Sequence, residues 1–196
     1  MTDVDSDGNA PAGGDADDWR TLDMLYDWLE PAPEGCKLEI VEGNVYLVPQ
    51  RDTHWRNTLA IIRQLSAHYE ENRLLSDVRV DFPGHLNGFA SDVLALASDA
   101  VKGEDGRWRY QDVEFVAEVI SKGTAVNDYG VKKAVYATAG VPVYLIVDPY
   151  TGTWHLHTLP KEDEYRSVLS LDFGTPVDLT STVVGLTLAT DAFPRD

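Results

Sequence analysis

The chain has 196 residues, of which 43% are hydrophobic, and it carries a formal net charge of −17 at pH 7. This length suits one domain with a buried core, and the hydrophobic content excludes a wholly disordered chain. The single cysteine excludes an intrachain disulfide and a zinc site of several cysteines, and the acidic charge disfavours a generic polyanion binder, which would carry a basic face.

The first 18 residues differ in composition from the rest of the chain. They hold six aspartates and no lysine or arginine, among Gly, Pro and Ala. We therefore predict a disordered acidic tail at 1–18 and a single folded domain at 19–196. The tail lacks the apolar stretch of a secretory signal, and the longest apolar run, Val141–Val147, is too short to span a membrane. These features lead us to expect cytoplasmic residence.

The domain is predicted to begin with a helix and a β-hairpin. Apolar residues recur at helical spacing from Leu22 to Leu29, and prolines at 31 and 33 end the pattern. Lys37–Val41 and Val45–Pro49 then alternate apolar and polar residues around Glu42-Gly43-Asn44. This alternation around a glycine-containing turn is typical of a hairpin.

A second helix and a strand should follow the hairpin. Thr53 is expected to cap a long amphipathic helix. Its predicted apolar face consists of Trp55, Leu59, Ile62, Leu65 and Tyr69. Val78–Phe82 reads as a strand before a loop marked by Pro-Gly and Asn-Gly pairs.

The second half of the domain alternates strands with one helix. The predicted elements are strands at Ala90–Ala97 and Val113–Ile120, a helix at Asn127–Ala139, and strands at Val141–Val147, Thr153–Leu159 and Tyr165–Leu171. Gly140 should form an αL cap after the helix, and the last two strands should pair. This order predicts an α+β fold, an α/β sandwich with helices flanking a mixed sheet.

Two acidic residues stand inside apolar runs of predicted strands. Asp92 lies in Ala90–Leu96 and Glu118 in Val116–Ile120. A carboxylate drawn into a core costs on the order of several kcal/mol unless it is paired or binds a cation. Two such acids on neighbouring strands, followed by Lys132 on a helix, suggest a divalent-metal site of the kind that nucleases use.

Several segments together resemble one family of nucleases. They are Lys37–Val45, His54, Ser91–Leu94, Val116–Ser121, Asp128–Tyr136 and Ala139–Pro149. Their order and residue types are similar to the PD-(D/E)XK nuclease superfamily, and more closely to the Uma family of bacterial restriction endonucleases, over residues 20–190. The resemblance implies a restriction-endonuclease-like mixed sheet and a Mg²⁺- or Mn²⁺-dependent endonuclease acting on nucleic acid, with DNA favoured. A homodimer is expected by analogy with this fold.

The resemblance also implies a role for individual side chains. These are Asp92 and Glu118 as metal ligands, Glu39 as an additional acid, and Lys132 as the residue that positions the nucleophile. The usual superfamily motif has its lysine two residues after the second acid, where this chain has Ile120. Uma-like sequences take the lysine from the following helix, where Lys132 lies. Lys122, in the loop after Glu118, is an alternative to Lys132.

Simpler interpretations stay open for several of these residues. They are an outward-facing charge for Glu39, a salt bridge with Asp128 for Lys132, a helix-start or near-site position for His54, packing for Tyr136 and a turn role for Asp148. Five arginines could form a modest basic surface or be engaged in ordinary salt bridges: Arg51, Arg56, Arg63, Arg73 and Arg79.

Other chemistries lack their usual sequence support. The chain has no Gly-x-Ser-x-Gly elbow, no phosphate-binding glycine loop and no His-Glu-x-x-His helix. The alternative to a nuclease is a catalytically inactive protein of nuclease fold that serves as an interaction or regulatory module. The acidic charge and the displaced lysine favour this alternative.

Overall fold

The computed structural model describes residues 16–196, so most of the predicted tail lies outside the described residues. Residues 16–18 begin the first helix, which therefore starts before the predicted end of the tail. The elements are α1 (Ala16–Leu29), β1 (Cys36–Val41), β2 (Asn44–Pro49), α2 (Asp52–Leu65), η1 (Glu71–Arg73), β3 (Leu74–Leu75), β4 (Arg79–Phe82), β5 (Asn87–Ala90), β6 (Val93–Leu96), η2 (Tyr110–Asp112), β7 (Val113–Val119), α3 (Ala125–Tyr129), α4 (Val131–Thr138), β8 (Val143–Asp148), β9 (Thr153–Lys161), β10 (Glu164–Asp172), β11 (Val177–Asp178) and β12 (Thr187–Leu188).

Two main sheets organise these elements. The larger sheet has the order β10-β9-β8-β7-β6-β3, and the smaller has the order β2-β1-β5-β4. The β7–β8 pair of the larger sheet is parallel and its other pairs are antiparallel, so this sheet is mixed. The predicted α+β fold is thereby confirmed. No helix within residues 16–196 has the length and apolar character needed to cross a bilayer.

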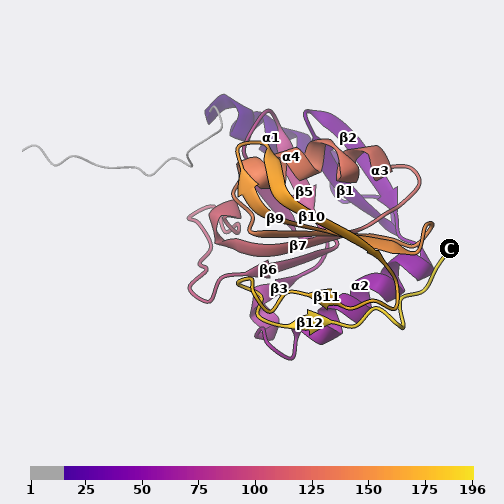
Figure 1. Cartoon of the computed structure of the whole chain (residues 1–196). Coiled ribbons are helices and arrows are strands. Elements are labelled where there is room, and N and C mark those ends of the chain that lie inside the picture. The colour runs from indigo at the N-terminus through magenta and orange to yellow at the C-terminus, as the bar shows by residue number, and fades with distance from the viewer. Residues whose placement is uncertain (1–15) are drawn as a thin grey trace, which may run out of the picture.

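The larger sheet lies between α2, β11 and β12 on one side and α4 on the other (Figure 1). Each side of the sheet packs into an apolar core of its own. Alternate strand residues face opposite sides. Val93 and Ala117 pack with α2, β11 and β12 on one side. Leu94 and Val116 pack on the other side with α4 and with Phe89 of the smaller sheet. The site described below lies on this second side, where the two sheets meet.

The predicted hairpin is confirmed. β1 and β2 pair from Cys36 opposite Pro49 to Val41 opposite Asn44. Glu42 and Gly43 both have positive φ, of 47° and 74°, which the tight two-residue hairpin turn requires. The predicted pairing of the last two long strands is also confirmed, as β9 with β10.

The strand predicted at Ala90–Ala97 is instead two strands. β5 ends at Ala90 in the smaller sheet and β6 begins at Val93 in the larger one. Both strands are buried throughout, so the apolar run continues across the break. Asp92 consequently lies in the link between the sheets rather than inside a strand.

The helix predicted at Asn127–Ala139 is broken at Gly130 into α3 and α4. Gly130 adopts φ −115° and ψ −97°, which interrupts the helix. A β-carbon at this position would stand 2.8 Å from the carbonyl oxygen of Val126. The expected αL cap after α4 is confirmed, since Gly140 has φ 75°.

The start of α2 differs from the prediction. The helix begins at Asp52 with Arg51 at the N-cap, so Thr53 lies within the first turn. The buried face includes His54, Thr58 and Ile61, whereas Trp55 of the predicted face is 47% exposed. Because residues 54 and 58 are polar, the spacing of apolar residues did not predict this buried face.

Candidate active site

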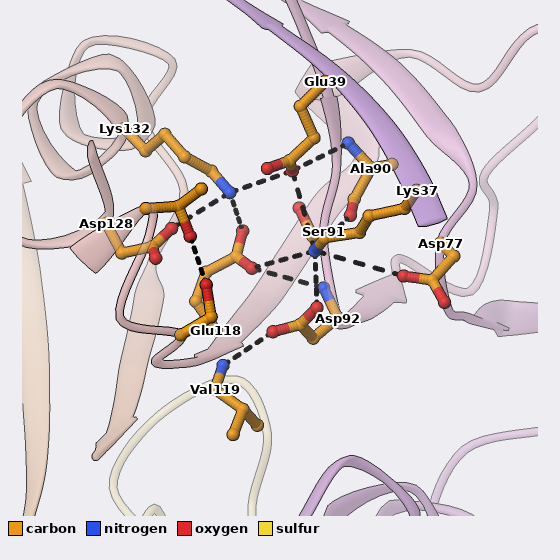
Figure 2. A network of polar contacts seen from close by, with 12 residues as sticks. Lys37, Glu39, Asp77, Ala90, Ser91, Asp92, Glu118, Val119, Asp128 and Lys132 are labelled. Atoms are coloured by element: carbon orange, nitrogen blue, oxygen red, sulfur yellow. Dashed lines mark hydrogen bonds and ion pairs between the residues drawn. The ribbon is translucent and has the colours of Figure 1, made fainter. Parts of the chain in front are cut away.

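A cluster of buried ionisable side chains lies where the two sheets meet (Figure 2). Its members are Lys37 and Glu39 from β1, Asp92 from the link between β5 and β6, Glu118 from β7 and Lys132 from α4, each at most 8% exposed. The structure thus brings together all four site residues suggested by the sequence, and adds Lys37.

On β1 and β7, successive side chains alternate between the two faces of the strand, and this alternation places the charged residues. On β1, Leu38 and Ile40 pack against α1, so Lys37 and Glu39 face the opposite side. On β7, Glu118 shares with Val116 the side that faces α4. The break at Gly130 lies two residues before Lys132, so Lys132 is the second residue of α4. Charged side chains from β1, β7 and α4 therefore meet in one small volume and form ion pairs there.

Asp92 is held from three directions. Its Oδ1 lies 2.5 Å from the Nζ of Lys37, and its Oδ2 accepts a hydrogen bond of 2.7 Å from the backbone N–H of Val119. The Nε2 of His54 lies 3.0 Å from Oδ2. Burial alone would raise the pKa of Asp92, but Lys37 and His54 hold it below its usual range. Asp92 is therefore a carboxylate at neutral pH.

Glu118 has a different environment. Its Oε1 accepts a hydrogen bond of 2.7 Å from the Tyr136 hydroxyl and lies 2.7 Å from the Nζ of Lys132. Its Oε2 accepts a bond of 3.3 Å from the backbone N–H of Asp92. Burial raises the pKa of Glu118 to about 8 in spite of the nearby Lys132 and Lys37. The two neighbouring acids thus have pKa values shifted in opposite directions.

Lys132 is bound on three sides by carboxylates. Its Nζ lies 2.7 Å from Glu118, 3.0 Å from Glu39 and 3.1 Å from Asp128. The pair with Asp128 is the predicted helical salt bridge, and burial raises the pKa of Asp128 to about 6. Lys122 is exposed, and its Nζ lies 4.9 Å from the centroid of the Tyr150 ring. The lysine that contacts Glu118 from the helix is therefore Lys132.

Lys37 is the member of the cluster that sequence reasoning missed. Its Nζ donates to the carbonyl oxygen of Ala90 at 2.9 Å and lies 3.8 Å from both Glu39 and Glu118. Burial would lower the pKa of Lys37, but Asp92 and Glu39 raise it well above its usual range, so it stays charged. Its position two residues before Glu39 on one strand was the available signal, because such residues share a face.

The contacts of three further residues show which of the roles left open by the sequence each residue has. His54 lies beside Asp92, as its contact shows, and Tyr136 is buried with its hydroxyl between Glu118 and Ser91. Asp148 accepts hydrogen bonds from the backbone N–H of Tyr150 and from the Tyr129 hydroxyl, both at 2.9 Å. Its predicted turn role is confirmed.

Three of the five arginines form ion pairs within the chain. Arg56 lies 2.8 Å from Asp52, Arg73 lies 3.3 Å from Glu114, and Arg79 pairs with two aspartates. These pairs favour the salt-bridge interpretation of those residues. A basic surface built from all five arginines is not supported.

The sequence of residues 22–191 matches the model of the Uma2 family, described as "Putative restriction endonuclease". The chain belongs to this family. Among solved structures, a putative nuclease from Anabaena variabilis is similar, with a TM-score of 0.66 and 16% identity over 88% of this chain and 96% of that chain. This likeness shows a shared fold. No curated protein matches the chain.

Restriction-endonuclease-like families such as Uma2 generally use divalent metal ions, and the charges of this cluster suit one. Glu39, Asp92, Glu118 and Asp128 face the ammonium groups of Lys37 and Lys132. If all were ionised, two negative charges would be left over, which a divalent ion would balance. Carboxylate oxygens are also the hard ligands that Mg²⁺ and Mn²⁺ prefer.

The geometry sets one condition on metal binding. Both oxygens of Asp92 and both oxygens of Glu118 already contact a donor of the protein. No group of three His, Cys, Asp or Glu side chains within residues 16–196 is arranged as a ready metal site. The ligand types therefore fit a divalent ion, provided that Lys37 leaves Asp92.

Proposed function

We propose that this Uma2-family protein is a divalent-metal-dependent endonuclease that hydrolyses phosphodiester bonds, with DNA as substrate and Mg²⁺ or Mn²⁺ as the ion. The observation that carries the proposal is the convergence of Asp92, Glu118, Glu39 and Lys132 in one buried cluster, in which carboxyl groups outnumber ammonium groups. Such convergence is typical of metal-assisted phosphodiester hydrolysis.

Asp92 and Glu118 would hold the ion. When bound, it supplies Lewis-acid stabilisation of the phosphate and lowers the pKa of a bound water. The hydrogen bond from Tyr136 orients Glu118, and the backbone N–H of Val119 orients Asp92. These contacts fix both ligands before substrate arrives.

Lys132 would stabilise negative charge on the phosphate and orient the attacking water. Its ammonium is fixed between Glu39 and Glu118, so little reorganisation is needed during the reaction. Glu39 would assist the reaction by holding Lys132 in place. It contacts Lys132 and accepts a hydrogen bond of 3.2 Å from the backbone N–H of Ala90.

The test is cleavage of single- and double-stranded DNA with Mg²⁺ or Mn²⁺, comparing the wild type with Asp92→Asn and Glu118→Gln. We expect metal-dependent cleavage by the wild type and a loss of about 100-fold or more in each variant. Equal cleavage by all three proteins would show that the activity comes from elsewhere and would contradict the proposal.

The inactive nuclease-fold module is a second candidate, and one observation favours it. Every carboxylate oxygen of Asp92 and Glu118 is satisfied by the protein itself, as a purely structural network requires. An absence of both metal binding and cleavage in the wild type would support this candidate.

The expected homodimer belongs to the same proposal. β10 is an edge strand of the larger sheet and exposes apolar side chains, among them Val168 and Leu169 at 58% and 48%. An unpaired edge with apolar side chains is suited to pair with a second copy. Sedimentation velocity tests this, and a monomer at all concentrations would contradict it.

A further inference from the structure

The ammonium of Lys37 stands among the very carboxylates that are proposed to hold the metal. Its Nζ is within 4.0 Å of oxygens of four acidic residues, namely Asp92, Glu118, Glu39 and Asp77. The closest of these contacts is to Asp92 Oδ1, at 2.5 Å. One positive charge of the chain therefore occupies the position in which a bound cation would contact both ligands (Figure 2).

Lys132 does not share this position. It reaches Glu118 through the other oxygen, Oε1, and its remaining partners are Glu39 and Asp128. Its side chain is 1% exposed. The two lysines therefore have separable roles. Lys37 bridges the two proposed ligands, whereas Lys132 contacts only Glu118 of the two, through its other oxygen.

Lys37 also has a place to move to. It lines a pocket of about 670 Å³ together with Gln50, Asp77 and Ala90. Asp77 is on the open side of the cluster, where its side chain is 37% exposed. The Asp77 carboxylate lies 4.0 Å from the Nζ of Lys37. A modest movement would let Lys37 exchange Asp92 for Asp77 and keep a carboxylate partner.

We propose that Lys37 is an internal cation that fills the metal position of the metal-free protein and moves toward Asp77 when a divalent ion binds Asp92 and Glu118. This inference rests on the proposed metal-dependent function. Lys37 keeps the buried carboxylates paired until metal arrives, since an unpaired buried carboxylate is costly. The same contact makes Lys37 a competitor of the ion, so metal affinity is set partly by this residue.

Calorimetric titration with Mn²⁺ tests the competition. Lys37→Met removes the competing ammonium, and Lys132→Met is the matched control, because it removes an equal charge from the same cluster. We expect Lys37→Met to bind Mn²⁺ at least about tenfold more tightly than the wild type, and to gain clearly more than Lys132→Met. Equal gains in the two variants, or no gain in Lys37→Met, would overturn the inference.

A second measurement uses the wild-type protein and needs no folded variant. Mass spectrometry reads how fast an amine-reactive reagent modifies each lysine, with and without Mn²⁺. Lys37 is 8% exposed and ion-paired, so we expect slow modification without metal and at least about threefold faster modification with Mn²⁺. Lys132 should stay protected in both conditions. Unchanged or slower modification of Lys37 in the presence of Mn²⁺ would overturn the inference.

The outcomes separate this inference from the proposed function. Mn²⁺ binding by the wild type, with equal affinity in Lys37→Met and unchanged Lys37 reactivity, overturns the inference and leaves the metal site standing. Binding by Lys37→Met alone would support the competition between Lys37 and the ion, and would contradict a metal-dependent activity of the wild type. An absence of Mn²⁺ binding in both proteins overturns the inference and the proposed function together.

Discussion

At the scale of single residues, the site contains two adjacent acids whose surroundings shift their pKa values in opposite directions. A lysine and a histidine lower the pKa of Asp92, whereas burial raises the pKa of Glu118. Pairs of titratable groups with divergent pKa values are typical of functional sites. Because burial raises the pKa of Glu118 to about 8, metal binding near neutral pH would have to displace a proton.

Glu118 makes the stability of the metal-free protein depend on pH. Its pKa rises from 4.5 to about 8 on folding, so between these values the folded chain holds a proton that the unfolded chain has lost. Stability is therefore expected to fall as pH rises through this range, and Asp128, with a pKa of about 6, adds to the fall over its lower part.

Urea denaturation of the metal-free protein at about pH 6 and about pH 8 measures this effect. Glu118→Gln cannot lose a proton, so it should remove about half or more of the pH dependence. A wild-type protein that is more stable at the higher pH would contradict the assignment of the proton to Glu118.

Lys132 is predicted to act in the reaction rather than in metal binding. Lys132→Met should lower the DNA cleavage rate about 100- to 1000-fold while Mn²⁺ still binds, because the variant keeps both proposed ligands. Lys122→Met is the matched control, since Lys122 is exposed beside Tyr150, and it should cleave at the wild-type rate. Loss of activity in Lys122→Met with full activity in Lys132→Met would reverse the assignment.

The candidate residues could be predicted because carboxylates inside apolar runs are rare unless they have a partner. Asp92 and Glu118 stood out for this reason. Lys37 did not, because a lysine on an alternating hairpin strand has the pattern of an ordinary solvated residue. Only the packing of β1 between α1 and the larger sheet buries it, and that packing is not readable from the hairpin sequence alone.

At the scale of elements, the two breaks in predicted elements position the site. The link between β5 and β6 carries Asp92 from one sheet to the other, and the break at Gly130 starts α4 just before Lys132. Neither break was predictable from periodicity. The strand run is apolar on both sides of its break, and a single glycine within a helical pattern is usually tolerated.

Gly130→Ala tests the importance of the helix break. The added β-carbon would stand 2.8 Å from the carbonyl oxygen of Val126, so the backbone of α3 or α4 must shift. We expect a loss of about 1–3 kcal/mol in the free energy of unfolding, together with slower cleavage, because Lys132 lies in the next turn. Denaturant unfolding and DNA cleavage measure the two effects.

Gly123→Ala is the control for this substitution. A β-carbon at Gly123 meets nothing within 4 Å, so this variant should keep the wild-type stability. Equal stability of the two alanine variants would show that the break at Gly130 tolerates a side chain.

At the scale of the whole molecule, the net charge of −17 opposes the approach of DNA. Residues 1–15 hold four aspartates and no lysine or arginine. Deletion of these residues should tighten DNA binding several-fold at low salt, with a smaller difference at high salt because charge repulsion is screened. Fluorescence anisotropy measures the affinities.

Replacement of the four aspartates by asparagine in the full-length chain separates charge from length. This variant should reproduce the effect of the deletion. An affinity unaffected by either change would contradict an electrostatic role for these residues and would favour the non-catalytic module.

The central claim is that Asp92 and Glu118 hold a divalent ion at the junction of the two sheets. A crystal structure of the wild type with Mn²⁺, with anomalous scattering recorded at the manganese edge, tests it most directly. We predict an anomalous peak in contact with both carboxylates, with Lys37 turned toward Asp77. A fully Mn²⁺-exposed crystal with no peak there, and with Lys37 still bound to Asp92, would contradict the claim.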